Sequence, residues 1–86
     1  MNISRNIWTV DGKTTNIKHN RKGLWIKVRG KASQHGIFKT DNSNIDVWIR
    51  QEVFDQANKD IHEHIKVYGH FVFDKDECWL IAEKIA

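Results

Sequence analysis

The residues best suited to chemistry alternate along one short stretch of the chain, residues 24–32. In an extended strand, every second residue lies on the same face at a spacing of about 6.6 Å, and here one face carries Trp25, Lys27, Arg29 and Lys31. Tryptophan rings stack on unpaired nucleic-acid bases, and lysine and arginine contact phosphates. The same pattern also fits a solvated basic face on which one large ring covers its neighbours. Taken alone, the stretch slightly favours this second interpretation.

A second alternating stretch, residues 44–50, repeats the combination of an indole and a cation. Ile45, Val47 and Ile49 would face inward, and the opposite face carries Asp46, Trp48 and Arg50. A surface shared by the two strands would therefore hold two tryptophans among cations. The predicted nucleic-acid site consists of this surface, a basic turn and two residues of a later strand: Trp25, Lys27, Arg29, Lys31, Trp48, Arg50, Lys18, His19, Arg21, Lys22, Lys66 and Tyr68.

The charges are unevenly distributed along the chain. Residues 1–40 contain nine lysine or arginine residues and one acidic residue, whereas residues 41–86 contain five and ten. This segregation predicts a basic side on the folded domain, suited to a polyanion. Uneven but ordinary surface charge is the alternative interpretation.

Composition and length exclude several classes of protein. The 86 residues suffice for one domain, and no apolar run approaches the length of about 18 residues that a membrane span needs. The first residues lack an apolar signal core, so we expect a cytoplasmic location. The sequence shows no nucleophile paired with a base and no phosphate-binding glycine loop, so we expect neither an enzyme nor a cofactor.

A metal site is also a weak hypothesis. Structural zinc sites use four ligands that usually arrive as close pairs, and the chain offers one such pair, His62 and His64. The other histidines and the single cysteine are scattered: His19, His35, His70 and Cys78. Cys78 is expected to be a small buried residue within a strand.

The hydrophobic pattern predicts short strands and one helix. Period-two segments cover residues 7–18, 24–32, 44–50, 65–73 and 78–85, and residues 37–40 form a short extended piece after a turn or bulge at residues 33–36. Residues 51–64 have a helical period with Val53, Phe54, Ala57 and Ile61 on one side. In the fourth strand, Phe71 and Phe73 are expected to face inward. The predicted fold is mainly β: a small five-stranded antiparallel barrel with one capping helix between strands 3 and 4. Gly30 and Gly69 fall on inward positions, where strands of a closed barrel must approach closely.

The chain resembles the OB fold in its single-stranded-DNA-binding and anticodon-binding types. The matching segments are residues 26–32, 45–50, 65–71 and 80–85, with the helix between the second and third of them. The resemblance covers residues 24–86 and leaves two registers open. The anticodon-binding type would begin its barrel at Leu24 and take residues 37–40 as its second strand. The single-stranded-DNA-binding type would begin at Ile7 and use one long second strand, which we prefer because Trp8 and Val10 need burial.

The resemblance implies that the outer face of the second and third strands binds single-stranded nucleic acid. The expected function is binding of DNA more than RNA, without base-specific readout, by an accessory protein in replication, recombination or repair. Homo-oligomers and replication or recombination proteins are further partners that the resemblance suggests. The final turn, Asp74 to Glu77, is shorter and more acidic than the loop that often clamps the strand in this family. The alternative is a protein-interaction module in which Val72, Trp79 and Ile81 form the contact surface.

Overall fold

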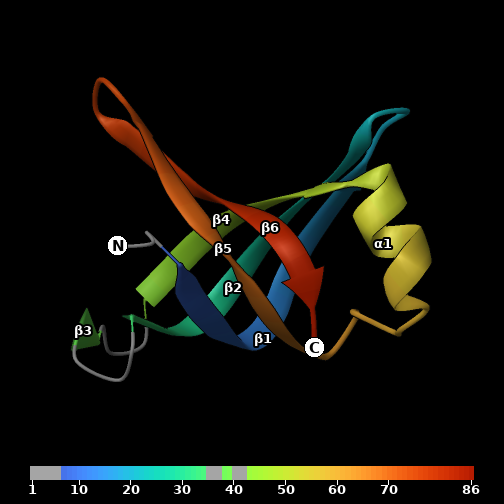
Figure 1. Cartoon of the computed structure of the whole chain (residues 1–86), viewed down its shortest axis with the longest axis horizontal. Coiled ribbons are helices and arrows are strands. Elements are labelled where there is room, and N and C mark those ends of the chain that lie inside the picture. Colours follow the sequence, from blue (N-terminus) through green and yellow to red (C-terminus); the bar gives the residue numbers. More distant parts are fainter. Residues whose placement is uncertain (1–6, 35–37, 40–42) are drawn as a thin grey trace, which may run out of the picture.

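The computed structural model describes residues 7–34, 38–39 and 43–86. Figure 1 shows its strands wrapped around a single core, with one helix at the side. In chain order the elements are β1 (Trp8–His19), β2 (Gly23–Gln34), β3 (Phe38–Lys39), β4 (Ser43–Arg50), α1 (Gln51–Ala57), β5 (His64–Asp74) and β6 (Glu77–Ile85). The first strand belongs to the sheet, as the preferred register expects. The expected second strand from Leu24 to Phe38 is too long, since β2 ends at Gln34 and Phe38 belongs to β3, which pairs back onto β2.

Five of these strands close into a barrel in the order β1, β5, β6, β4, β2, and the pairing of β2 with β1 completes the ring. The short β3 pairs with the end of β2. The predicted mainly β barrel, with a helix between its third and fourth strands, is therefore confirmed. One described pairing differs from the antiparallel expectation, because β4 and β6 run parallel where Val47 lies beside Leu80.

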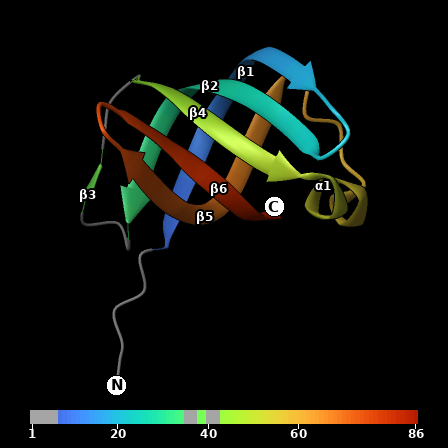
Figure 2. The ribbon, with the colours of Figure 1, turned by 90° about the horizontal axis from the view of Figure 1, so that it is seen from above.

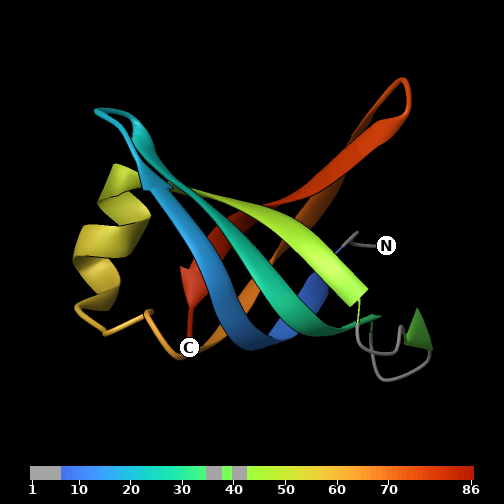
Figure 3. The same ribbon diagram turned by 180° about the vertical axis from the view of Figure 1, so that it is seen from behind.

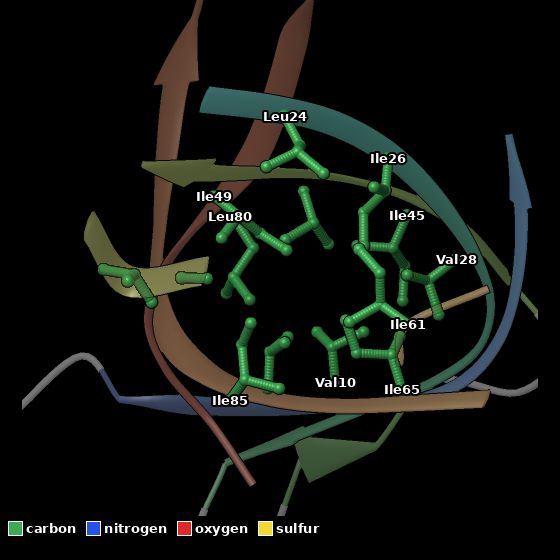
Figure 4. Close-up of a cluster of buried hydrophobic side chains, with 14 of the residues drawn as sticks. Val10, Leu24, Ile26, Val28, Ile45, Ile49, Ile61, Ile65, Leu80 and Ile85 are labelled. Carbon is green, nitrogen blue, oxygen red and sulfur yellow. The ribbon is translucent and has the colours of Figure 1, made fainter. Parts of the chain in front are cut away.

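The core follows from the alternation of apolar and polar residues in the strands. In Figure 4 the inward side chains of β1, β2, β4, β5 and β6 converge on the barrel interior. β2 shows the pattern most clearly, since Leu24, Ile26 and Val28 are buried and the residues between them are exposed. α1 adds Val53 to this core, with Phe54 and Ala57 packed against it. The helix thus helps to cover the core, as its apolar side predicts.

β1 and β2 come closest where two glycines lie opposite each other, Gly12 and Gly30. A Cβ on Gly30 would lie 2.6 Å from the Cα of Gly12 and would overlap the carbonyl oxygen of Asp11. A Cβ on Gly69 would overlap the carbonyl oxygen of Ile81. The inward glycines predicted from the sequence are therefore required by close contacts between strands.

The predicted helix was too long. It ends at Ala57, where Asn58 adopts a left-handed conformation (φ 50°, ψ 47°) that stops the helix. The following residues form a loop that still carries Ile61 into the core. Burial of Ile61 was thus anticipated, but from a helix rather than a loop. No helix in the described part of the chain has the length and apolar character needed to cross a membrane.

Two hairpins extend from the barrel. Figures 1 and 2 show the β1–β2 turn and the β5–β6 turn at opposite sides of the molecule. The β5–β6 turn occupies Lys75 and Asp76, as the charged sequence predicts. Because this hairpin continues past the barrel, the inward positions at its tip reach solvent. The prediction that Phe73 faces the core is wrong, since its side chain is 73% exposed, and Cys78 is exposed rather than buried.

Candidate nucleic-acid interface

An open cleft of about 780 Å³ lies between the two hairpins. This volume lies within the range of about 300–1,000 Å³ that is usual for ligand sites. β1 and β2 form one side of the cleft, β4 contributes its floor, and the β5–β6 hairpin forms the other side. The lining residues are Asn16, Lys18, Trp25, Ile26, Lys27, Asp46, Asp76, Glu77, Cys78 and Trp79.

Three indole rings cluster on the outer surface at this cleft. Trp25 and Trp48 are register partners on β2 and β4, and their ring centroids lie 5.1 Å apart with a tilt of 42°. Trp79 of β6 meets Trp25 edge-to-face at 6.0 Å. Trp25 is the most exposed of the three, at 38%. Its ring therefore offers a face on which a further aromatic group can stack.

Trp25 and Trp48 are the two indoles predicted for the site, but the cleft is lined by Trp25 and Trp79. Trp48 is half-buried and supports Trp25 from the neighbouring strand. Trp79 was assigned instead to a protein-contact surface. The parallel pairing of β6 with β4 brings it into the cluster, and no local pattern in the sequence marks that pairing.

Charges of both signs line the cleft. Lys18 is the register partner of Trp25, and Lys27 forms an ion pair with Asp46 across the strands at 3.8 Å, with the two side chains 49% and 53% exposed. Such an exposed pair adds at most about 1 kcal/mol to stability. Asp76 and Glu77 lie at the opposite rim. The cleft is thus basic on the β1–β2 side and acidic on the β5–β6 side.

Beyond the cleft, three cations form a basic stripe on the outer face of β1 and β2, defined here as Lys13, Arg29 and Lys31. Figure 3 shows these two strands running side by side across the molecule. Lys13 and Arg29 are register partners, and like charges placed directly opposite each other destabilise a sheet. Among the described residues, none of the three has an acidic side chain within ion-pair distance. Asp11 is the register partner of Lys31 on the same face and contacts His64. The three cations can therefore contact an anion, with one carboxylate beside the Lys31 end of the stripe.

The remaining predicted site residues fall into two groups. Arg21 and Lys22 are exposed in the β1–β2 turn, and Arg50 is exposed at the end of β4. His19 is held by Gln51, with its Nε2 atom 2.7 Å from the side-chain oxygen. These four residues extend the basic end of the cleft toward the helix.

Lys66 and Tyr68 lie elsewhere. They belong to β5, which is separated from β4 by β6 and from β2 by β1. The ammonium of Lys66 lies 5.9 Å from the ring centre of Tyr68. Lys66 is a register partner of Asp11, which in turn lies opposite Lys31, so Lys66 is two strands away from Lys31 of the basic stripe. The geometry does not bring them to the cleft.

The described histidines make pairs rather than a metal site. Among the residues that the structure describes, no three histidine, cysteine or acidic side chains come together as metal ligands would. His64 contacts Asp11 and His70 contacts Glu83, while His35 lies outside the described residues. In the loop after α1, the backbone N–H of His62 donates to Asp60, and this bond, with the His62 side chain, lowers the pKa of the Asp60 carboxyl.

Comparison of the chain with family models, curated proteins and solved structures finds no match. The closed five-stranded barrel is compatible with an OB-type fold. The indole-lined cleft lies on the outer face of the second and third strands of the barrel, β2 and β4, between the two hairpins. Function has to be inferred from the geometry and chemistry of this site.

Proposed function

We propose that the chain binds single-stranded nucleic acid in the cleft between its two hairpins. The observation that carries the proposal is the exposed ring of Trp25, placed between Trp79 and Lys18 in an open cleft. An unpaired base can stack on this ring, which contributes about 1–3 kcal/mol per base. The neighbouring lysine can neutralise the phosphate of the stacked nucleotide.

The basic stripe offers a path along which the nucleic-acid backbone can leave the cleft. Trp25 and Arg29 are four residues apart on β2, which corresponds to about 13 Å along a strand. A strand stacked on Trp25 can therefore follow β2 and place successive phosphates beside Arg29, Lys13 and Lys31. These contacts add affinity that falls with salt and carry no sequence information.

The ligand proposed is DNA more than RNA, and the role is that of an accessory protein in replication, recombination or repair. Both follow from the resemblance to single-stranded-DNA-binding OB domains. Affinity for a short oligonucleotide on the order of micromolar is expected from one or two stacked bases and a few phosphate contacts.

Intrinsic tryptophan fluorescence tests the proposal. Titration with a thymidine oligomer should quench the emission to saturation, because a base stacks on Trp25, and raising the salt should weaken binding steeply. Polyglutamate serves as the control polyanion, since it has charge but no bases to stack. Equal quenching by polyglutamate, or none by DNA or RNA oligomers, would refute the proposed function.

A protein-interaction module is the second candidate, favoured by a separate exposed aromatic group. The ring of Phe73 lies 6.4 Å from that of Phe71, which meets Trp8 edge-to-face at 5.2 Å. These residues line an apolar hollow of about 310 Å³ at the base of the β5–β6 hairpin, which shares Asp46 and Cys78 with the cleft. An exposed apolar group of this kind suits a protein partner or a second copy of the chain. Such binding would persist at high salt, unlike binding of nucleic acid.

A further inference from the structure

A surface that binds only phosphates is not expected to carry carboxylates, but this cleft does. Three acidic residues line it, Asp46, Asp76 and Glu77, against two cations. A polyanion held by charge alone would be repelled by such a lining. The acidic groups therefore call for a ligand group that donates hydrogen bonds.

Asp46 is the carboxylate best placed to meet a base. It lies on β4, between the strands that carry Trp25 and Trp79, and it lines the same cleft as both rings. Lys27 approaches Oδ1 at 3.8 Å, which is too long for a hydrogen bond. No hydrogen bond to the Asp46 side chain is found among the described residues, and half of that side chain is exposed.

An ionised carboxylate only accepts hydrogen bonds, so it discriminates between bases by the donors on their edges. Guanine presents two adjacent donors, N1–H and the N2 amino group, which match the two oxygens of one carboxylate. Thymine and uracil present a single N–H between two carbonyl oxygens, and those oxygens are repelled by the carboxylate. Bidentate contacts of this kind give the largest discrimination between bases.

We propose that Asp46 makes the cleft selective for guanine: the base stacks on Trp25 and donates its N1–H and N2 amino group to the Asp46 carboxylate. The inference depends on the proposed function and deepens it, because it replaces binding without base readout by a preference at one nucleotide. Lys27 faces the carboxylate from the neighbouring strand at 3.8 Å. An exposed pair of this kind adds little to stability, so the Asp46 side chain can turn to a ligand at little cost.

Three oligomers of equal length test this assignment: all thymidine, thymidine with one central guanosine, and thymidine with one central inosine. Inosine keeps N1–H and lacks the N2 amino group. The unaltered protein should bind the guanosine oligomer at least about fivefold more tightly than the thymidine oligomer, with inosine between them. In Asp46→Asn this preference should disappear, because an amide offers one acceptor and one donor group.

The ratio of affinities is the readout, since loss of a negative charge alone strengthens binding of every oligomer. Asp74→Asn is the matched control: it removes the same charge from an exposed position of the β5–β6 hairpin that does not line the cleft, and it should keep the preference for guanosine. Equal binding of the three oligomers by the unaltered protein, or a preference that survives Asp46→Asn, would overturn the inference and leave the proposed function intact. Failure of all three oligomers to bind would instead refute the proposed function.

Discussion

Trp25→Ala should weaken binding of a thymidine oligomer by about 5- to 150-fold, which corresponds to the loss of about 1–3 kcal/mol of base stacking. Trp25 is the most exposed indole of the cleft and contacts both Trp48 and Trp79. Its removal takes away the stacking surface and the ring that holds the other two together. The side chain lies on the outer face of β2, so the barrel core remains complete. Fluorescence anisotropy of a labelled oligomer measures the change, and circular dichroism checks the fold.

Phe73→Ala is the matched control for this variant. It also removes an exposed aromatic ring, but from the apolar hollow outside the cleft. Its affinity for the oligomer should equal that of the unaltered protein. Equal losses of affinity in the two variants would indicate that the oligomer adheres to any exposed aromatic ring. A loss of affinity confined to Phe73→Ala would place the ligand in the apolar hollow instead of the cleft.

Neutralising the basic stripe should weaken oligomer binding by a factor similar to that of Trp25→Ala, and this loss of affinity should depend on the salt concentration. The triple variant Lys13→Gln, Arg29→Gln, Lys31→Gln removes up to three phosphate contacts, each worth about 0.7 in the slope of log K against log salt for a single strand. The slope should therefore fall by about 2, and affinity at low salt should fall by up to on the order of 10²-fold. Titrations from low to high salt measure both quantities.

The stability of the triple variant separates binding from folding. Lys13 and Arg29 face each other across β1 and β2, so their neutralisation removes a repulsion, whereas Lys31→Gln removes the attraction between Lys31 and its register partner Asp11. The two effects oppose each other, so the free energy of unfolding should change by less than about 1 kcal/mol. Lys59→Gln, in the exposed loop after α1, removes one cation away from the stripe and should leave the slope unchanged. An unchanged slope in the triple variant would show that the nucleic-acid backbone does not follow the stripe.

Much of the fold can be predicted from the sequence because its core positions alternate so regularly. The buried residues Leu24, Ile26 and Val28, and likewise Ile45, Val47 and Ile49, are the ones that a two-residue period selects. The same period places Trp25 and Trp48 on the outer face, and their contact follows from the register of β2 with β4. Local alternation is sufficient for such features, because it depends on one strand at a time.

The basic stripe could not be predicted in full because of an irregularity in β1. Counting back from the β1–β2 turn pairs Asn16 with Lys27, but a bulge at Thr15 shifts the register, so that Lys13 rather than Thr14 lies opposite Arg29. The Thr15 hydroxyl donates to the carbonyl of Lys27 at 3.1 Å within this bulge. A single extra residue reverses the two faces of the strand beyond it, and nothing in the local pattern marks its position.

Features that depend on where strands leave the barrel were also missed. Phe73 continues the inward alternation of β5, but the hairpin has passed the barrel end at that point and the ring reaches solvent. Trp79 joins the indoles through a parallel pairing between strands far apart in the sequence. Lys66 and Tyr68 alternate outward like the other site residues, but they lie on β5, which pairs with neither β2 nor β4. Alternation predicts which residues of one strand point outward, whereas closure of the barrel decides which outward residues of different strands come into contact.

The indole N–H resonances test the location of the ligand most directly. The chain has four tryptophans, and each gives one Nε1–H signal in a ¹H–¹⁵N spectrum of the labelled protein, assigned with single substitutions. On titration with a short thymidine oligomer, the signals of Trp25 and Trp79 should shift most, while that of Trp8, which lines the neighbouring apolar hollow and not the cleft, should shift least. Shifts confined to Trp8, or no shift of any indole signal at saturating oligomer, would contradict the proposed site.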